Sequence, residues 1–235
     1  MVNFTMLAHN RPRLTKQAIE SLGEHPDCNV IVRADKWDDD ETREILFDWS
    51  ARNARTGRVV YHTTKYAGTG EARNDGIATS EQAFGRGDYL YLSDNDVFFK
   101  PGWLKTLILC YEAVWKHGFK VIGAYNHPYH QPVPPALLMG PGNIEVHQVH
   151  ALALQSMLMK WEVWDKYGPF CKTEPGRVCQ SEDVDFTNKI IADGGKIGVV
   201  SPALIVNTGI TNSFGKKIPG WELVKAQCPG GVICE

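Results

Sequence analysis

Residues 88–99 of the chain read DYLYLSDNDVFF, and this stretch decides how the rest of the sequence is interpreted. Apolar and aromatic residues run through to Ser93, which predicts a strand over residues 88–93. Asp94, Asn95 and Asp96 follow at once, before apolar residues resume. Ligands of open α/β sheets collect at the carboxyl ends of the strands. Two carboxylates at such an end can share a divalent cation that also holds a diphosphate, although Asp and Asn also favour solvated turns.

Upstream of this stretch, short apolar runs alternate with amphipathic segments. The predicted strands cover residues 2–8, 29–34 and 59–62, and the predicted helices begin at Pro12 and cover residues 41–53 and 70–84. Strands that alternate with helices indicate a parallel, doubly wound sheet. The predicted fold class is therefore α/β, a Rossmann-like single domain with a mostly parallel central sheet.

The pattern changes downstream of residue 100. Helices are predicted over residues 103–117, 160–167 and 182–193, and strands over residues 121–124, 145–154, 197–200 and 203–206. A long proline-rich connection separates the first two of these strands, and such connections are often functional. The tail from Gly209 is rich in Gly and Lys and is predicted to be mobile.

The bulk properties exclude several classes of protein. With 235 residues, 43% of them hydrophobic, the chain is expected to form one sizeable core. The formal net charge of −2 gives no basic face, so we expect neither nucleic acid nor an anionic membrane as a partner. The N-terminus lacks the features of a signal peptide, and no apolar run reaches the roughly 20 residues that span a bilayer.

The six cysteines form no C-x-x-C pair, which argues against a zinc knuckle. Scattered free thiols without a leader sequence predict a reducing compartment, and the expected location is cytoplasmic. Cys228 and Cys234 are close enough in sequence to close a small disulfide loop, which is the alternative to free thiols in the tail.

Several motifs together resemble the GT-A glycosyltransferases, in particular those of family 2. Asp94-Asn95-Asp96 resembles the family's DXD motif, and residues 70–77, GEARNDGI, resemble the helix that precedes it. Ser181-Glu182-Asp183 resembles the acidic pair that carries the catalytic base, and Gly168-Pro169-Phe170 matches a recurrent turn. Residues 5–12 resemble the opening strand and nucleotide loop. The motifs occur in the family's order over about residues 2–207.

This resemblance implies a specific reaction. The expected activity is inverting, metal-dependent transfer of a sugar from a nucleoside-diphosphate sugar, with a UDP-sugar favoured, to a hydroxyl of a glycan or other acceptor. The expected cofactor is Mn²⁺ or Mg²⁺, between which the sequence does not choose. Residues 1–99 would form the nucleotide-binding half, residues 100–207 the acceptor-binding half, and residues 208–235 the tail.

The resemblance also assigns roles to individual residues. Asp183 is the expected catalytic base, which the positive end of a helix would keep ionised. Asp94 and Asp96 are the expected metal ligands, and Asp94 contacts the ribose in an alternative reading. The expected donor-binding residues are Thr5, Ala8, His9, Arg11, Asp35, Arg73, Asp94 and Asn95.

One position departs from the family pattern. A histidine late in the sheet often supplies a third metal ligand, but the matching segment here reads Ile205-Val206-Asn207-Thr208. Asn207, His150 or water are the alternatives for this ligand. The side chains assigned to the acceptor or to a closing lid are Trp161, Glu182, Lys216 and Lys217.

Two rival functions remain open at this stage. A sugar-phosphate nucleotidyltransferase would have the same kind of α/β sheet. Such an enzyme normally has a Gly-rich, basic loop after the first strand, where this chain has His9-Asn10-Arg11-Pro12. A non-catalytic nucleotide-sugar or glycan-binding module would not need both Asp96 and Asp183.

Overall fold

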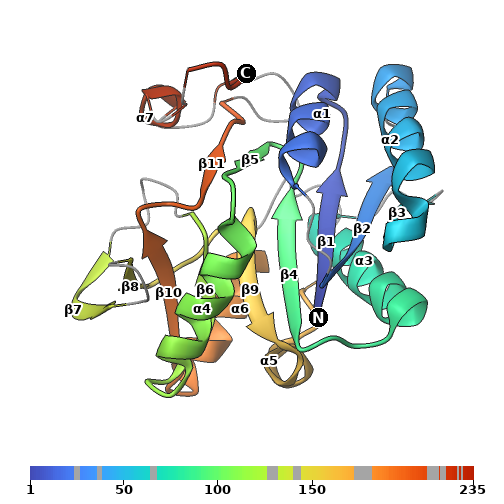
Figure 1. Ribbon diagram of the computed structural model, residues 1–235. Coiled ribbons are helices and arrows are strands. Elements are labelled where there is room, and N and C mark those ends of the chain that lie inside the picture. Colours follow the sequence, from blue (N-terminus) through green and yellow to red (C-terminus); the bar gives the residue numbers. More distant parts are fainter. Residues whose placement is uncertain are drawn as a thin grey trace.

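Strand β1 (Val2–Ala8) lies inside a nine-stranded sheet with the order β3-β2-β1-β4-β9-β6-β10-β8-β7 (Figure 1). The computed structural model describes residues 1–23, 27–35, 39–63, 68–125, 132–139, 144–171, 182–210, 217, 221–226, 228 and 230–235. Almost all of β1 is buried because helices cover both faces of the sheet, which explains its nearly continuous apolar sequence.

The first half of the chain builds four neighbouring parallel strands. After β1 come α1 (Pro12–Ser21), β2 (Cys28–Asp35), α2 (Asp40–Asn53), a 3-10 turn (Ala54–Thr56), β3 (Arg58–Thr63), α3 (Thr69–Phe84) and β4 (Tyr89–Asp94). Val2 pairs with Cys28 of β2 on one side and with Tyr89 of β4 on the other. The predicted alternation of strands and helices is confirmed here, with boundaries that differ by one or two residues.

The second half of the chain completes the sheet with mixed strands. Its elements are β5 (Val97–Phe99), α4 (Trp103–Trp115), β6 (Phe119–Gly123), β7 (Pro132–Met139), β8 (Glu145–Val149), β9 (Ser156–Lys160), α5 (Trp161–Tyr167), α6 (Glu182–Ala192), β10 (Lys196–Ser201), β11 (Ile205–Asn207) and α7 (Trp221–Ala226). The pairings imply that β8 and β9 are antiparallel to the other seven strands of the large sheet, so most of its strands point in the same direction.

Two predictions about this half were wrong. A single irregular strand over residues 145–154 is replaced by β8, which ends at Val149, and by β9, which begins at Ser156. Strand β9 is central, since it pairs with both β4 and β6, and its Met157, Leu158 and Met159 are fully buried. The proline-rich connection contains a strand, β7, paired with β8.

Helices cover the two faces of the sheet in two sets. One buried cluster joins the sheet to α1, α2 and α4 through side chains such as Leu46 and Leu107. The other joins it to α3, α5 and α6 through side chains such as Ile77 and Phe186. In Figure 1 the carboxyl ends of β1, β2 and β4 point to the top of the view, where the acidic turn after β4 lies.

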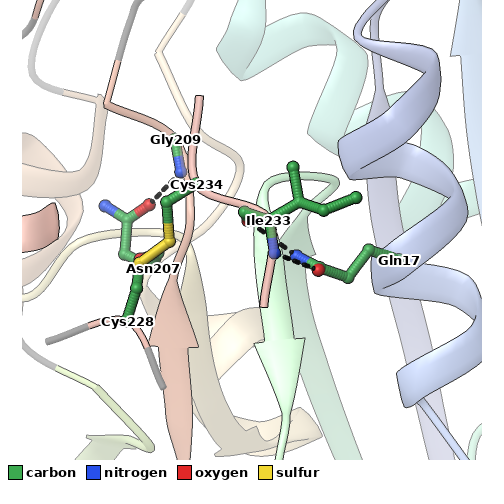
Figure 2. The surroundings of a disulfide bond; sticks show 6 residues. All are labelled: Gln17, Asn207, Gly209, Cys228, Ile233 and Cys234. Atoms are coloured by element: carbon green, nitrogen blue, oxygen red, sulfur yellow. Dashed lines mark hydrogen bonds between the residues drawn. A yellow bond between two sulfur atoms is a disulfide. The ribbon is translucent and has the colours of Figure 1, made fainter. Parts of the chain in front are cut away.

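The C-terminal tail is tied to the rest of the molecule (Figure 2). Cys228 and Cys234 form a disulfide, so the expectation that these thiols are free was wrong. Gln17 of α1 makes two hydrogen bonds with the backbone of Ile233, of 3.0 and 2.7 Å. Glu235 donates its N–H to Thr208 and accepts one from Ile210. These contacts were not predicted, whereas the mobility of the tail stays a prediction.

Among the helices of the described residues, none combines the length and the apolar character that a bilayer-spanning segment requires.

Candidate active site

The first carboxylate of the acidic turn is held by an arginine from α3. Arg73 is only 3% exposed and donates through Nη2 to Oδ1 of Asp94, the last residue of β4. Its Nη1 donates to the carbonyl of Ser93 at 3.3 Å. Arg73 thus neutralises Asp94 and fixes the end of the strand at the same time, which places this predicted residue in the site.

The second carboxylate, Asp96, pairs with an arginine from the loop after β1. Arg11 Nη1 donates to Asp96 Oδ2 at 2.6 Å. Burial raises the pKa of Asp96, the charge of Asp94 raises it further, and the Arg11 guanidinium opposes both effects. The backbone of Thr208 donates to the Asp96 carbonyl at 2.8 Å, so β11 closes this side of the turn.

The middle residue of the motif holds the loop rather than the site. The buried Asn95 amide donates to Thr15 Oγ1 at 2.6 Å and to the Asn10 carbonyl at 3.1 Å. Asn10 and Arg11 both have left-handed backbones, with φ of 52° and 57°, which is uncommon outside glycine. Asn95 therefore stabilises the loop conformation that directs Arg11 to Asp96, and its contact with the donor stays a prediction.

The helix motif around Arg73 also connects α3 to the second half of the chain. Asn74 makes two hydrogen bonds of 3.0 Å with the backbone of Phe170. A Cβ on Gly70 would lie 2.3 Å from the Cys171 carbonyl, so this contact requires glycine. Each part of the motif has a physical role, because Arg73 binds the acidic turn and Gly70 and Asn74 fix the chain that leads toward α6.

The acidic pair lies at the start of α6, near the Arg73–Asp94 pair. Glu182 is 5% exposed, and burial raises its pKa, with Asp183 and Asp94 adding to the effect and Arg73 opposing it. Asp183 is half-buried, and its Oδ1 accepts the N–H of Val184 at 2.8 Å. The fold therefore brings together the two acidic motifs that the sequence singled out. Ser181, which precedes the pair, lies outside the described residues.

One buried polar atom of the turn, Asp96 Oδ1, has no hydrogen-bond partner among the described residues. The buried Asn207 side chain lies against the Tyr125 hydroxyl, and hydrogen bonding between them lowers the pKa of Tyr125. Asn207 is 1% exposed, is the last residue of β11 and pairs with Val97, the residue after Asp96. Its amide oxygen, Oδ1, accepts the N–H of Gly209 at 2.9 Å (Figure 2). Buried polar atoms that lack protein partners usually meet a ligand, an ion or water.

Tyr125 and Gly209 are candidate site residues that the sequence did not reveal. Burial raises the pKa of Tyr125 to about 12, hydrogen bonding with Asn207 opposes the rise, and the charge of Asp96 adds to it. Tyr125 follows β6 at the carboxyl edge of the sheet. This position after a strand is the sequence feature that could have identified it as a site residue. A Cβ on Gly209 would lie 2.1 Å from Asp96 Oδ2 and 3.0 Å from Arg11 Nη1, so the backbone there packs directly on the ion pair.

Two predicted residues are not brought to the site. Trp161 follows Lys160, which pairs with Tyr89 at the start of β4, so its ring lies at the opposite edge of the sheet from Asp94. Arg86 packs on that ring at 4.7 Å, and the predicted acceptor role is not supported. His150 is exposed and follows Val149, which pairs with the start of β10, also at the opposite edge. It is therefore wrongly placed for a metal ligand.

The remaining predicted positions are buried, exposed or outside the described residues. Thr5 is 4% exposed in the middle of β1 beneath α3, so it does not line an open pocket. Ala8 ends β1 and is buried, and His9 after it is exposed. Asp35 ends β2, but its side chain lies outside the description, as does Lys216, whereas Lys217 is exposed.

An acidic turn after β4, a second acidic pair at the start of α6 and helices on both faces of this sheet define the GT-A architecture. The family model described as glycosyl transferase family 2 matches residues 4–121, just over half of the chain. The chain belongs to this family.

Three solved structures align with the chain, and the first of them has a similar fold. S. aureus TarS 1-349 in complex with UDP aligns with a TM-score of 0.53 and 16% identity over 86% of this chain and 58% of that one. The inositol-1-phosphate CTP transferase from T. maritima gives 0.47 and 11% over 99% and 98%. The nucleoside-diphosphate-sugar pyrophosphorylase from Vibrio cholerae RC9 gives 0.48 and 12% over 88% and 95%. No curated protein sequence matches the chain.

The family implies a divalent cation, and the residues present are compatible with one. Among the described residues, no three His, Cys, Asp or Glu side chains gather as a complete metal site. Mg²⁺-type sites, however, often use only one or two carboxylates together with waters and phosphate oxygens. The unpartnered Oδ1 of Asp96 has the chemistry of such a ligand.

Proposed function

We propose that the chain is an inverting glycosyltransferase that moves a sugar from a UDP-sugar to a hydroxyl of a glycan or other acceptor. Family membership supports sugar transfer, and the fold is similar to that of a UDP-bound protein. The finer points, which are the base of the donor, inversion and the acceptor, are proposals.

One observation carries this proposal. Two arginine–carboxylate pairs lie at the carboxyl edge of the sheet, and the Arg73–Asp94 pair is electrostatically coupled to the acidic pair of α6. Two positively charged arginines favour binding of a diphosphate, and a nearby carboxylate can deprotonate an acceptor hydroxyl. A binding module would need the arginines but has no use for the second acidic pair.

In the proposed reaction, Asp183 is the catalytic base. Its carboxylate takes the proton of the acceptor hydroxyl while the hydroxyl oxygen bonds to the anomeric carbon. The bond from that carbon to the diphosphate breaks in the same step, and the nucleoside diphosphate leaves with the electron pair. Attack opposite the leaving group inverts the anomeric configuration. Asp183 lies in the first turn of α6, where it is half-buried.

Asp96 and Asp94 would hold the divalent cation, and water would supply the third ligand, because the Asn207 oxygen already accepts the N–H of Gly209. A bound Mn²⁺ or Mg²⁺ neutralises the charge that builds on a departing diphosphate. Arg73 would assist from its fixed position on α3, because the planar fork of an arginine suits phosphate oxygens.

A donor screen tests the proposal. Thermal unfolding should be measured with UDP-, GDP-, dTDP- and CMP-sugars, each with and without Mn²⁺. Bound ligand stabilises the folded state by mass action, so the UDP-sugars with metal should raise the melting temperature most. Anomeric coupling in the transfer product should then show inversion. Formation of nucleotide sugar from a sugar phosphate and a nucleoside triphosphate, without transfer, would identify a nucleotidyltransferase instead.

Cysteine pairing bears on the compartment. The cytoplasm is the predicted location, but the Cys228–Cys234 disulfide favours an oxidising environment. Thiol labelling of the protein taken directly from its cells would decide between the two.

A further inference from the structure

Arg11 is placed on Asp96 by a loop that several contacts hold in a costly conformation. Asn10 and Arg11 are two successive left-handed residues other than glycine, and such backbone strain clusters at functional sites. Asn95 and Thr15 both donate to the Asn10 carbonyl, and the Asn10 side chain accepts the N–H of Asp39 at 2.9 Å. The loop is therefore built to direct Arg11 at the carboxylate.

The pair that results leaves one carboxylate oxygen unused. Asp96 Oδ2 binds Arg11, whereas Oδ1 is buried and has no partner among the described residues. The Gly209 backbone closes over Oδ2 and the guanidinium. A buried carboxylate needs a counter-charge, and Arg11 supplies it in the absence of a metal.

A dication on Asp96 would compete with that counter-charge. Like charges that share one carboxylate repel, and a dication and a monocation roughly 5 Å apart repel even in water by the equivalent of about tenfold in binding. An anion placed between them removes the repulsion, and a diphosphate is such an anion.

We propose that Arg11 is the counter-ion of Asp96 in the metal-free protein and that it passes to the donor diphosphate when metal and donor bind together. Arg11 is then a positioning residue that couples the two ligands: metal alone binds weakly, and each ligand strengthens the other. This inference deepens the proposed function and rests on it for the location of the metal.

Arg73 does not share this behaviour. It is more buried than Arg11, it lies within a regular helix, and it also binds the Ser93 carbonyl. The exchange is therefore assigned to Arg11 alone.

Mn²⁺ binding to the free protein tests the proposal. Its affinity should be measured by calorimetry for the wild type, Arg11→Met, Arg11→Lys and the control Arg13→Met. Arg13 lies two residues further on, in the first turn of α1, but its side chain is 64% exposed and pairs with Glu235 at the surface. Arg11→Met should bind Mn²⁺ at least about tenfold more tightly than the wild type. Arg11→Lys keeps the positive charge and Arg13→Met leaves the site intact, so both should bind as the wild type does.

The same proteins should be titrated with UDP with and without Mn²⁺. In the wild type, Mn²⁺ should tighten UDP binding, and in Arg11→Met this coupling should shrink by about tenfold, because coupling is reciprocal. Unchanged Mn²⁺ affinity in a folded Arg11→Met protein overturns the proposal. So does wild-type protein that binds Mn²⁺ equally well with and without UDP, a result that does not depend on whether the variant folds. Absence of UDP binding in all four proteins would instead count against the proposed function.

Discussion

The two carboxylates after β4 are paired with arginines that are held in different ways. On the fixed side, defined by Arg73, Asp94 and Glu182, the arginine lies in a regular helix and is 3% exposed. On the exchangeable side, defined by Arg11, Asp96 and Gly209, the arginine comes from a strained loop and its side chain is 18% exposed. A side chain held in a helix and bonded to a strand end has one position, whereas a partly exposed side chain on a loop can take a second. The site therefore combines a fixed charge with one that can move.

The largest expected effect concerns the carboxylates beside the fixed side. Asp183→Asn keeps the shape of the side chain but cannot take a proton. Turnover should fall by about 10²–10⁴-fold, the usual contribution of a general base, while UDP binding by calorimetry changes little. Glu182→Gln is the matched variant and should lose less, because Glu182 is buried against the arginine pair. A larger loss from Glu182→Gln than from Asp183→Asn would reassign the base.

The second prediction compares the stability of two arginine variants and tests directly whether the two sides differ. Arg73→Met leaves Asp94 and the buried Glu182 without their cation and should cost about 2–4 kcal/mol of unfolding free energy. Arg11→Met should cost less, because Asp96 can then bind a proton. Urea unfolding measures both.

Added Mn²⁺ supplies the control for these variants. It should restore the stability of Arg11→Met, since the metal replaces the missing charge on Asp96. It should not restore Arg73→Met. Equal rescue of both would show that the two sides do not differ in the way the geometry indicates.

The first half of the fold was predictable because its signals are local. Runs such as Val2–Ala8 are apolar, lie between turn residues and pair with neighbours close in sequence. Strand β9 escaped prediction because five residues with Met157, Leu158 and Met159 are as compatible with a loop or a helix as with a strand. Only its long-range pairing with Tyr91 and Ile122 makes it central.

The site divides in the same way. Asp94, Asp96 and Arg73 were predicted because a motif at a strand end has meaning before the fold is known. The pairing of Arg11 with Asp96 joins residues 85 apart in sequence, and no local pattern encodes it. Asn95 was predicted to bind the donor because it lies between Asp94 and Asp96 in the motif. Its side chain instead points toward the loop after β1. Trp161 was misplaced because the direction of β9 was unknown.

The third effect concerns the tail that lies against the exchangeable side. Cys228→Ser removes a disulfide that closes a short loop, and loop entropy places the expected loss at about 2 kcal/mol at most. The Ile210 and Glu235 amides, which bond across the tail, should exchange faster with solvent. Wild-type protein treated with reductant should match the variant, and unchanged exchange in both would mean that the hydrogen bonds of Gln17 alone hold the tail.

The smallest effect is a pH dependence that tests whether Glu182 belongs to the fixed side. Burial raises the folded-state pKa of Glu182, so the folded protein binds this proton more tightly than the unfolded chain does. Stability from this group is therefore greatest in acid and is lost as the pH rises from the unfolded pKa through the folded one. Glutamine does not titrate, so Glu182→Gln should gain stability relative to the wild type between about pH 4 and pH 7.

Urea unfolding at those two pH values measures the change, and Glu44→Gln, at an exposed position of α2, controls for the loss of a surface charge. The comparison sharpens in the Arg73→Met background. Arg73 opposes the rise in the pKa of Glu182, so removing it should enlarge the benefit of Glu182→Gln at pH 7. In the Arg11→Met background the benefit should be the same as in the wild type, because Arg11 serves Asp96 on the other side. If the stability benefit of Glu182→Gln grew equally in both backgrounds, both arginines would act on Glu182 alike. The distinction between a fixed and an exchangeable side would then fail.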